Sequence, residues 1–310
     1  MRTPAMSARA AKGGRVAALW RWVNLPALAA VVIWGAAFPI VKYALGEFPV
    51  LAYAALRPVI AVALLFGLLR LRGEPMAVDR RDWPRLLAAG YAGMALFQLC
   101  FILGLGYTSA SHSALLLCTS PLLGAVVLWL GRREPVSARS LVGLLLGLTG
   151  MALVVLQADP SGTASLAGDL LTLLAALGWV GVTILPRSLV ARYGPVKVTA
   201  WLLLAGATVL VAIGWQETLE ALRSPPSLLA WLSLLYSAVV AMVLANVLWQ
   251  RAVRALGSTQ TLAYFYLQPV VAILLAAAML GERLGLLQAI GGAITLLGVG
   301  LVQRGKPTTG

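Results

Sequence analysis

The sequence predicts an all-α integral membrane protein with ten transmembrane helices in two inverted five-helix repeats. Three observations predict this fold. The 310 residues are 61% hydrophobic and 11% charged, with a mean hydropathy of +0.91, whereas soluble domains carry about 25% charged residues. Apolar segments of about 20 residues, the length that crosses a hydrocarbon core, recur along the chain. A pattern of proline, glutamate and glycine residues also occurs twice at one spacing.

Ten apolar segments are long enough to cross a membrane. They occupy 26–46, 50–70, 85–106, 110–131, 138–157, 168–187, 195–214, 227–249, 257–280 and 286–303. The spacers between them are too short for a soluble domain. The expected organisation is a basic tail (1–25), a first repeat (26–157), a linker (158–167), a second repeat (168–303) and a second tail (304–310).

The basic residues predict the orientation of these segments. Twenty of the 24 Lys and Arg residues lie in the two tails and in every second loop, as they do in cytoplasmic loops under the positive-inside rule. Both termini are therefore expected in the cytoplasm. The net charge of +14 reflects membrane topology rather than a nucleic-acid partner. The expected partners are the lipid bilayer and a small-molecule substrate.

The repeated pattern predicts how the two halves are related. Pro121 and Glu134 precede Pro269 and Glu282 by the same 148 residues. Because five crossings are an odd number, the second half enters the membrane from the opposite side. Inverted repeats are a recurrent plan of secondary transporters, which bind substrate near the membrane midplane at the repeat interface. This arrangement suggests alternating access, and a duplication retained only for packing is the alternative.

The chain also resembles a known family. Trp34-Gly35 in the first segment, Arg57 in the second and the two Pro-x12-Glu stretches before glycine-rich fifth and tenth segments are similar to the EamA family of the drug/metabolite transporter superfamily. The resemblance covers about residues 26–303. It implies a ten-helix transporter of the bacterial inner membrane that exports amino acids or other small metabolites, and it does not identify the substrate.

Polar and aromatic residues inside the apolar segments predict a central cavity, since such side chains are costly in a membrane unless they face a cavity or another helix. Gln260, Tyr264 and Gln268 are four residues apart and share one helix face. The counterparts of the two glutamines at the repeat spacing are His112 and Ser120. Hydrogen bonds that only hold helices together are the alternative.

Two further pairs complete the expected substrate site. Tyr91 and Gln98 are seven residues apart in the third segment, and Trp34 and Trp179 occupy related places in the first and sixth. Aromatic rings suit an apolar side chain and amides suit a zwitterionic head group, although packing is the alternative for both tryptophans. The expected substrate-binding residues are Trp34, Tyr91, Gln98, His112, Ser120, Trp179, Tyr264 and Gln268.

Prolines and charges near helix ends predict gates and hinges. A proline inside a membrane helix frees a backbone carbonyl, which can bend the helix or bind a ligand. Lys42 and Arg187 stand at corresponding places near opposite membrane faces, and snorkelling to the interface is the simpler alternative for both. The expected gating and hinge residues are Lys42, Pro121, Arg187, Gln260 and Pro269.

Glycine-rich faces predict close helix packing. Gly143 and Gly147 lie on the fifth segment, and Gly291, Gly292 and Gly298 lie on the tenth. Packing within the chain is one interpretation, and a homodimer through these helices is the other.

The polar residues also restrict the function class. No acidic residue lies clearly inside an expected span, and His112 is the single histidine. His112 could carry a coupling proton or act only as a hydrogen-bonding residue, and facilitated exchange needs neither. An enzyme is disfavoured because no His/Asp/Glu cluster, metal-ligand spacing or phosphate-binding loop occurs in the sequence. We expect no cofactor and no metal. Efflux of drugs or other metabolites is the alternative function.

Overall fold

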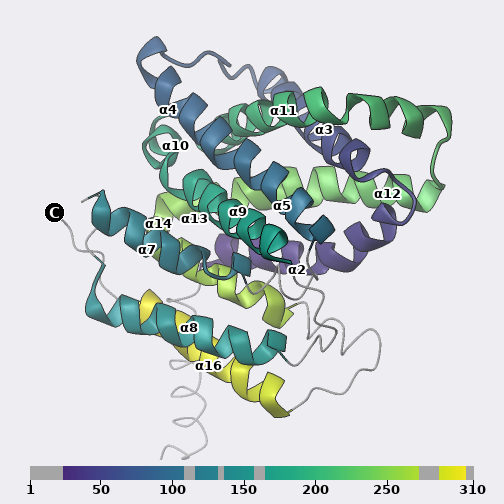
Figure 1. Ribbon diagram of the computed structural model, residues 1–310. Helices are drawn as coiled ribbons and strands as arrows, with labels where there is room; N and C mark the ends of the chain where they lie inside the picture. The colour runs from purple at the N-terminus through teal and green to yellow at the C-terminus, as the bar shows by residue number, and fades with distance from the viewer. Residues whose placement is uncertain (1–23, 108–115, 132–135, 157–164, 272–285, 305–310) are drawn as a thin grey trace, which may run out of the picture.

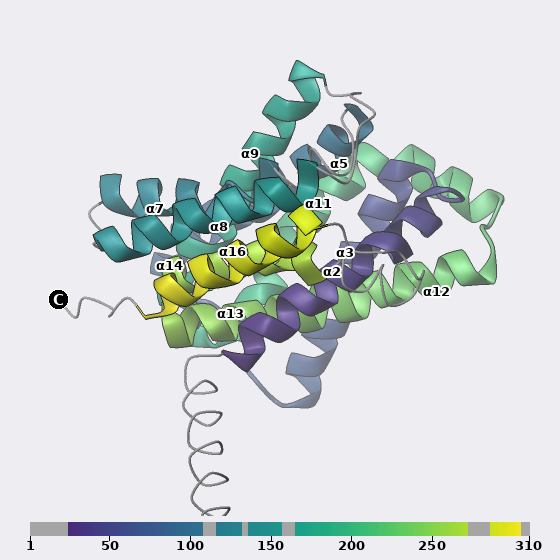
Figure 2. The same ribbon diagram turned by 90° about the horizontal axis from the view of Figure 1, so that it is seen from below.

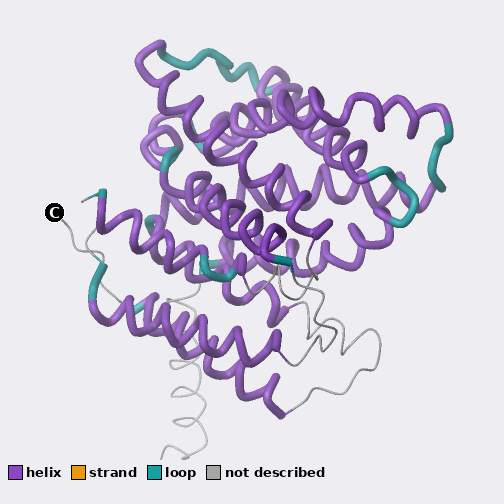
Figure 3. The backbone as a smooth tube through the Cα atoms, in the orientation of Figure 1, coloured by secondary structure: helices purple, strands orange, loops and turns teal. Residues whose placement is uncertain are grey.

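The computed structural model describes residues 24–107, 116–131, 136–156, 165–271 and 286–304, and in this part of the chain all regular structure is helical (Figures 1 and 3). The α-helices are α2 (Leu25–Leu45), α3 (Val50–Leu71), α4 (Trp83–Ala88), α5 (Leu96–Tyr107), α7 (Ser120–Leu130), α8 (Ala138–Leu156), α9 (Leu166–Ile184), α10 (Arg187–Tyr193), α11 (Pro195–Arg223), α12 (Leu228–Tyr236), α13 (Ala245–Leu256), α14 (Ser258–Ala263) and α16 (Leu286–Gln303). Four short segments have other windings: the 3₁₀ turns η1 (Arg80–Asp82) and η4 (Tyr264–Tyr266), and the π-helices η2 (Ala89–Ala95) and η3 (Ser237–Leu244).

Five continuous helices of the described chain are long and apolar enough to cross a membrane. They span Val50–Leu71, Arg80–Gly104, Leu166–Tyr193, Pro195–Arg223 and Leu228–Leu256. Shorter apolar helices cover Leu25–Ala37, Ser120–Leu130, Ala138–Leu153 and Ala289–Gln303. The chain is therefore a multi-pass helical membrane protein, as the composition predicted.

The helix α11 is longer than the apolar segment 195–214 that predicted it. It continues to Arg223, and its last turns contact another helix. The carboxylate of Glu217 accepts hydrogen bonds from the backbone amides of Leu51 at 2.8 Å and Ala52 at 3.4 Å. These amides begin α3, which has no side-chain cap of its own, and a carboxylate at a helix N-terminus is stabilising. Glu217 therefore joins α11 to α3.

Polar contacts near the helix ends show which of the described ends lie on the same side of the bundle. At one end, Arg192 at the end of α10 pairs with Asp79 in the segment that follows α3. At the other end, Glu47 after α2 accepts a 2.7 Å hydrogen bond from the amide of Ser227, which precedes α12. The ends of α3 and α10 thus lie together, and the ends of α2 and α11 lie together, as successive antiparallel crossings require.

Two long helix pairs lie on opposite sides of the molecule, α3 with α11 and α8 with α16 (Figure 1). Figure 2 shows α8 and α16 side by side from the perpendicular direction. The helices α2, α9 and α13 lie between these pairs and form the centre of the protein (Figure 1).

Glycines form the contact between α8 and α16. A Cβ added to Gly150 would lie 2.5 Å from the backbone nitrogen of Thr295, and one added to Gly298 would lie 2.5 Å from that of Gly147. The two backbones therefore touch, as small-residue faces in membranes permit. Both glycine faces are used within one chain, and a homodimer through them would have to separate α8 from α16.

The two π-helices recur at the spacing of the sequence repeat. η2 begins at Ala89 and η3 at Ser237, 148 residues apart like the prolines. η2 packs against α9 and α11, whereas η3 packs against α2 and α3. Each π-helix therefore contacts the first two long helices of the other half of the chain.

We predict that Gly298→Ala lowers the free energy of unfolding by about 1–3 kcal/mol, the usual cost of overpacking, because its Cβ would meet the α8 backbone. Gly300→Ala is the matched control, since no atom lies within 4 Å of a Cβ at that position of the same helix. Thermal unfolding of the detergent-purified protein measures both. Equal unfolding temperatures for the two variants would contradict the backbone contact.

Acid is expected to loosen the contact between the α2–α3 loop and α12. Hydrogen bonds from the backbone amide of Ser227, its hydroxyl and the hydroxyl of Tyr43 hold the pKa of Glu47 below its usual value. The carboxylate thus stabilises the folded state above its unfolded pKa, and this stabilisation is lost as the pH falls through the lowered folded pKa. Glu47→Gln should unfold at a lower temperature than wild type at neutral pH, and this difference should vanish in acid. Glu220→Gln, at an exposed site, is the control and should show no such pH-dependent difference.

Candidate functional site

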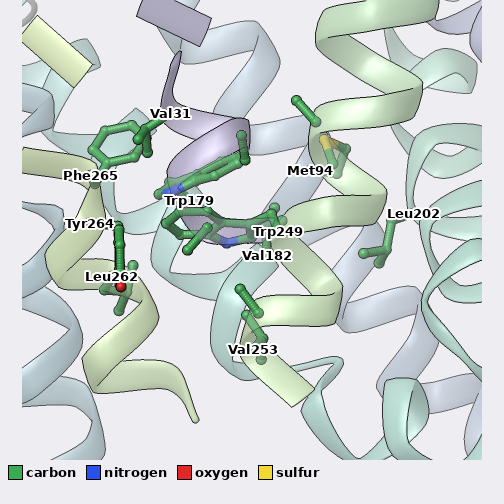
Figure 4. Packing of buried hydrophobic residues seen from close by; sticks show 14 of the residues in the cluster. Val31, Met94, Trp179, Val182, Leu202, Trp249, Val253, Leu262, Tyr264 and Phe265 are labelled. Carbon is green, nitrogen blue, oxygen red and sulfur yellow. The ribbon is translucent and has the colours of Figure 1, made fainter. Parts of the chain in front are cut away.

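Four aromatic rings meet at the centre of the protein. They come from Trp34 of α2, Trp179 of α9, Trp249 of α13 and Phe265 of η4. Every pair of these rings has its centroids between 5.0 and 6.4 Å apart, and Trp34 and Trp179 are the closest. Figure 4 shows Trp179, Trp249 and Phe265 together within the buried core. We call these four rings the central aromatic cluster.

The indole nitrogens of the cluster differ in their partners. Trp34 donates to the carbonyl oxygen of Ala241 at 2.9 Å, and Trp249 donates to the hydroxyl of Thr183 at 3.1 Å. Ala241 lies within η3, and the wider π turn alters the backbone pairing there. The buried indole nitrogen of Trp179 has no hydrogen-bond partner among the described residues. One donor is thus left free at the edge of the cluster.

Two buried amides flank the cluster on α13. Asn246 and Gln250, one turn apart on either side of Trp249, are 6% and 1% exposed. Their nitrogens donate to the carbonyls of Met242 at 2.9 Å and Val182 at 3.1 Å. Their side-chain oxygens are buried, and no donor from the described parts of the chain reaches them. Because native structures leave few buried polar atoms unpaired, such atoms indicate a place for a ligand or an ion.

A guanidinium lies about one helical turn from this cluster. Arg57 of α3 donates to the hydroxyl of Ser237 at 3.2 Å, and Ser237 stands four residues before Ala241 on η3. The guanidinium carbon lies 5.0 Å from the ring centroid of Tyr53. The Nε of Arg57 is buried without a hydrogen-bond partner among the described residues, and no carboxylate of that part of the chain lies within 4 Å of Arg57. A cation inside a membrane helix with no counter-ion indicates a functional site.

Arg57, Asn246 and Gln250 were not among the predicted site residues. Glu47, the acidic residue closest to Arg57 in the sequence, binds Ser227 and Tyr43 instead. In each case the signal in the sequence was a polar side chain within an apolar segment, and for Asn246 and Gln250 it was a pair of amides four residues apart.

Ser120, a predicted substrate-binding residue, bonds to its own backbone in this structure. Its side chain is fully buried, and its hydroxyl donates to the carbonyl of Leu117 at 2.6 Å. This is the carbonyl that Pro121, which has no amide hydrogen, cannot bond in a helix. Pro121 stands in the first turn of α7. The hydroxyl of Ser120 therefore supplies the hydrogen bond to the Leu117 carbonyl that the proline cannot make.

Tyr91 and Gln98 do not share a face, which corrects the second prediction. Tyr91 is 45% exposed, with its hydroxyl 3.4 Å from that of Thr208, whereas Gln98 is 5% exposed. The reason is η2, which contains Tyr91 and ends before Gln98. A π-helix pairs residues five apart, so seven positions no longer bring the chain back to the same side.

Gln260 and Tyr264 also point to different partners instead of one cavity wall. The amide nitrogen of Gln260 lies 3.4 Å from the carbonyl oxygen of Gln303, and the side chain of Gln303 donates back to the carbonyl of Gln260 at 2.8 Å. The hydroxyl of Tyr264 accepts from the amide of Asn24 at 2.8 Å, just before α2. The 3₁₀ turn η4 (Tyr264–Tyr266) follows Gln260 and α14, and it interrupts the α-helical spacing between Tyr264 and Gln268.

The other expected residues have mixed outcomes. Gln268 and Pro269 are partly buried in the helical stretch 267–271, and the backbone oxygen of Gln268 would lie 3.0 Å from a Cβ on Gly35. Arg187 begins α10 and lines a cavity of about 300 Å³ with Arg85 and Ser188, away from the aromatic cluster. His112, Glu134, Glu282 and the side chain of Lys42 lie outside the described residues.

These features define a multi-pass helical membrane protein with a polar, aromatic site among its central helices. The model of the EamA-like transporter family matches residues 21–156 and again 166–304. The chain therefore belongs to the EamA-like transporter family, as the sequence resemblance indicated. It is a transporter and not an enzyme.

Its relatives are similar along most of their length. The chain is 26% identical to "Uncharacterized transporter YyaM" of Bacillus subtilis (strain 168), covering 86% of this chain and 89% of the relative. It is also 26% identical to "Probable terminal-alkyne amino-acid exporter" of Streptantibioticus cattleyicolor, covering 88% and 91%. A solved structure titled "Crystal structure of protein" matches with a TM-score of 0.75 at 20% identity, over 90% of this chain and 96% of that chain. This last similarity shows the fold.

We predict that Trp34→Phe lowers the free energy of unfolding by about 1 kcal/mol, the typical net value of one hydrogen bond, because the bond to Ala241 is lost while most of the ring packing remains. Trp215→Phe is the control, since Trp215 is 57% exposed on α11. Thermal unfolding in detergent tests both. A Trp34→Phe variant as stable as the control would show that this hydrogen bond adds nothing.

Proposed function

We propose that this transporter exports amino acids or closely related small metabolites by alternating access, from a site between two inverted five-helix repeats. The observation that carries the proposal is the central aromatic cluster. Beside it lie buried polar atoms and a guanidinium for which the described residues supply no hydrogen-bond partner and no counter-ion, respectively. The cluster draws Trp34 from the first half of the chain and its other three rings from the second.

Three observations support the inverted repeats and the ten crossings. The family model matches the chain twice, on either side of the expected linker. The π-helices η2 and η3 recur at the 148-residue spacing of Pro121 and Pro269. Their packing partners are exchanged between the halves, α9 and α11 for one and α2 and α3 for the other. With the positive-inside rule, we infer five crossings in 26–157, five in 168–303 and both termini in the cytoplasm of a bacterial inner membrane.

The unpaired groups suit an amino-acid zwitterion. A guanidinium binds a carboxylate through two parallel charge-assisted hydrogen bonds, and Arg57 still has a free Nε. The buried oxygens of Asn246 and Gln250 can accept hydrogen bonds from an ammonium group. The aromatic rings offer a face to an apolar side chain or to the ammonium itself. The relative named as a probable amino-acid exporter agrees with this substrate class.

The indole nitrogens suggest how the two halves exchange roles. Inverted repeats in one conformation cannot be equivalent, and here Trp34 bonds to η3 while Trp179 bonds to no described group. The residue that precedes Ala241 by the repeat spacing is Gly93 of η2, and the carbonyl of Gly93 lies 3.1 Å from a Cβ added to Gly178. We propose that the opposite conformation breaks the Trp34 bond and forms one from Trp179 to η2.

Efflux of drugs or other metabolites remains the alternative, because the aromatic rings would also bind a flat apolar compound. Arg57 separates the two functions. A cation with no carboxylate near it in the described chain favours a substrate with a carboxylate and repels a cationic drug.

Counterflow in proteoliposomes tests the proposal. Vesicles containing purified protein are loaded with one unlabelled amino acid at a time, and uptake of its labelled form is followed with and without a pH gradient. Saturable exchange indicates an amino-acid transporter, and indifference to pH removes His112 from the coupling mechanism. No exchange of any amino acid by folded protein would reject the substrate class and favour drug efflux.

Arg57→Gln should raise the KM of a carboxylate substrate by about tenfold or more, since losing a hydrogen bond to a charged group costs about 1.5–3 kcal/mol. Arg57→Lys keeps the charge without the forked geometry, so its KM should lie between those of the wild type and Arg57→Gln. For the amide analogue of the same substrate, the KM should change little in either variant. Arg223→Gln, at the exposed end of α11, is the control. An equal loss for acid and amide would contradict a carboxylate site at Arg57.

A further inference from the structure

A second cavity of about 520 Å³ lies at the end of the bundle where α10 ends and α11 begins. It is lined by Glu74, Tyr193, Gly194, Lys197, Arg251 and Arg254, among others. These residues come from three segments of the chain that the positive-inside rule places in the cytoplasm. We propose that this cavity binds a phosphate-bearing anion. The anion is the headgroup of an acidic phospholipid or a soluble phosphate.

The cavity carries an excess of positive charge. Three cations line it, Lys197, Arg251 and Arg254, and the carboxylate in its wall is that of Glu74. Glu74 is partly neutralised from outside, since its oxygen lies 4.0 Å from Arg72. The two arginines are exposed and three residues apart in the last turns of α13, so they share one face.

Lys197 is the buried member of this group. The residue is only 7% exposed, and its ammonium lies 5.4 Å from the ring centroid of Tyr193. No carboxylate from the described ranges lies within 4 Å of that ammonium. A buried cation is costly without a counter-charge, and an anion in the cavity would supply one.

The backbone adds donors to the same wall. α11 begins at Pro195 directly after Gly194, and no side chain caps its first turn. The amides of Val196 and Lys197 therefore have no partner inside the helix, and both residues line the cavity. Gly194 has a φ of 82° and a ψ of 159°, a conformation essentially confined to glycine. A helix N-terminus beside three cations is a suitable site for phosphate.

The cavity lies where the ends of two apolar helices meet, α11 and the helix that ends at Leu256. It lies at the ends of membrane-spanning helices, and basic pockets between such helices on the cytoplasmic side bind acidic headgroups. It is also separate from the central site: Arg251 is exposed, whereas the neighbouring Gln250 points into the core and is 1% exposed. The proposal does not depend on the transported substrate.

Thermal unfolding of the full-length protein in detergent tests this site. The probes are phosphatidylglycerol, phosphatidylcholine and inorganic phosphate, the last compared with chloride at equal ionic strength. We expect phosphatidylglycerol, but not phosphatidylcholine, to raise the unfolding temperature of the wild type. In Arg251→Gln/Arg254→Gln this rise should be lost, while Arg223→Gln/Arg304→Gln should retain it. If inorganic phosphate raises the unfolding temperature of the wild type and of Arg223→Gln/Arg304→Gln but not of Arg251→Gln/Arg254→Gln, the site binds a soluble anion.

Native mass spectrometry provides a readout that does not depend on stability. The wild type should retain phosphatidylglycerol at concentrations at least tenfold lower than the Arg251/Arg254 variant does. If neither phosphatidylglycerol nor phosphate distinguishes that variant from the Arg223/Arg304 control in either measurement, the proposal is wrong. Lys197→Gln separates the contribution of the buried cation from that of the two exposed arginines. It should weaken anion binding without changing the exposed charge.

Discussion

The backbone of a membrane helix must find all its hydrogen-bond partners within the protein, because the bilayer offers no water. Three interruptions of the described helices are accompanied by a side chain that meets this requirement. Ser120 bonds the carbonyl that Pro121 leaves free, and Trp34 bonds a carbonyl in the π-helix η3. Glu217 bonds the first amides of α3. Several polar residues within apolar segments thus serve the backbone before they serve a substrate.

The same requirement explains which sequence predictions were right. Hydropathy and length identified a multi-pass helical membrane protein because burial in lipid acts on each residue almost independently. The predicted faces depended on an unbroken α-helical period, which η2 interrupts between Tyr91 and Gln98 and η4 interrupts between Tyr264 and Gln268. The sequences of η2 and η4 contain no proline and little else that signals a π or 3₁₀ turn. Arg57 was visible as a lone cation in an apolar run, but only the structure shows that it has no described counter-ion.

The central aromatic cluster links packing with the proposed transport. Its rings fill the space between α2, α9 and α13 and so hold the two halves together. The polar atoms at its edge have no partner in the described part of the chain, and an unpaired polar atom costs stability in a membrane interior. A site that binds a substrate and then releases it requires such a compromise, since groups fully satisfied by the protein would have nothing to offer a ligand.

The glycine contact between α8 and α16 has a consequence for how this sequence can diverge. Gly150 and Gly298 face the partner backbone and have no room for a side chain, whereas Leu145 and Leu296 on the same two helices are exposed. Apolar residues on the exposed side can exchange freely because lipid adapts to their shape. In descendants of this chain, the number of substitutions per position would therefore rise and fall every three or four residues along both helices. Their variability alone would then reveal which face of each helix is packed against protein and which faces lipid.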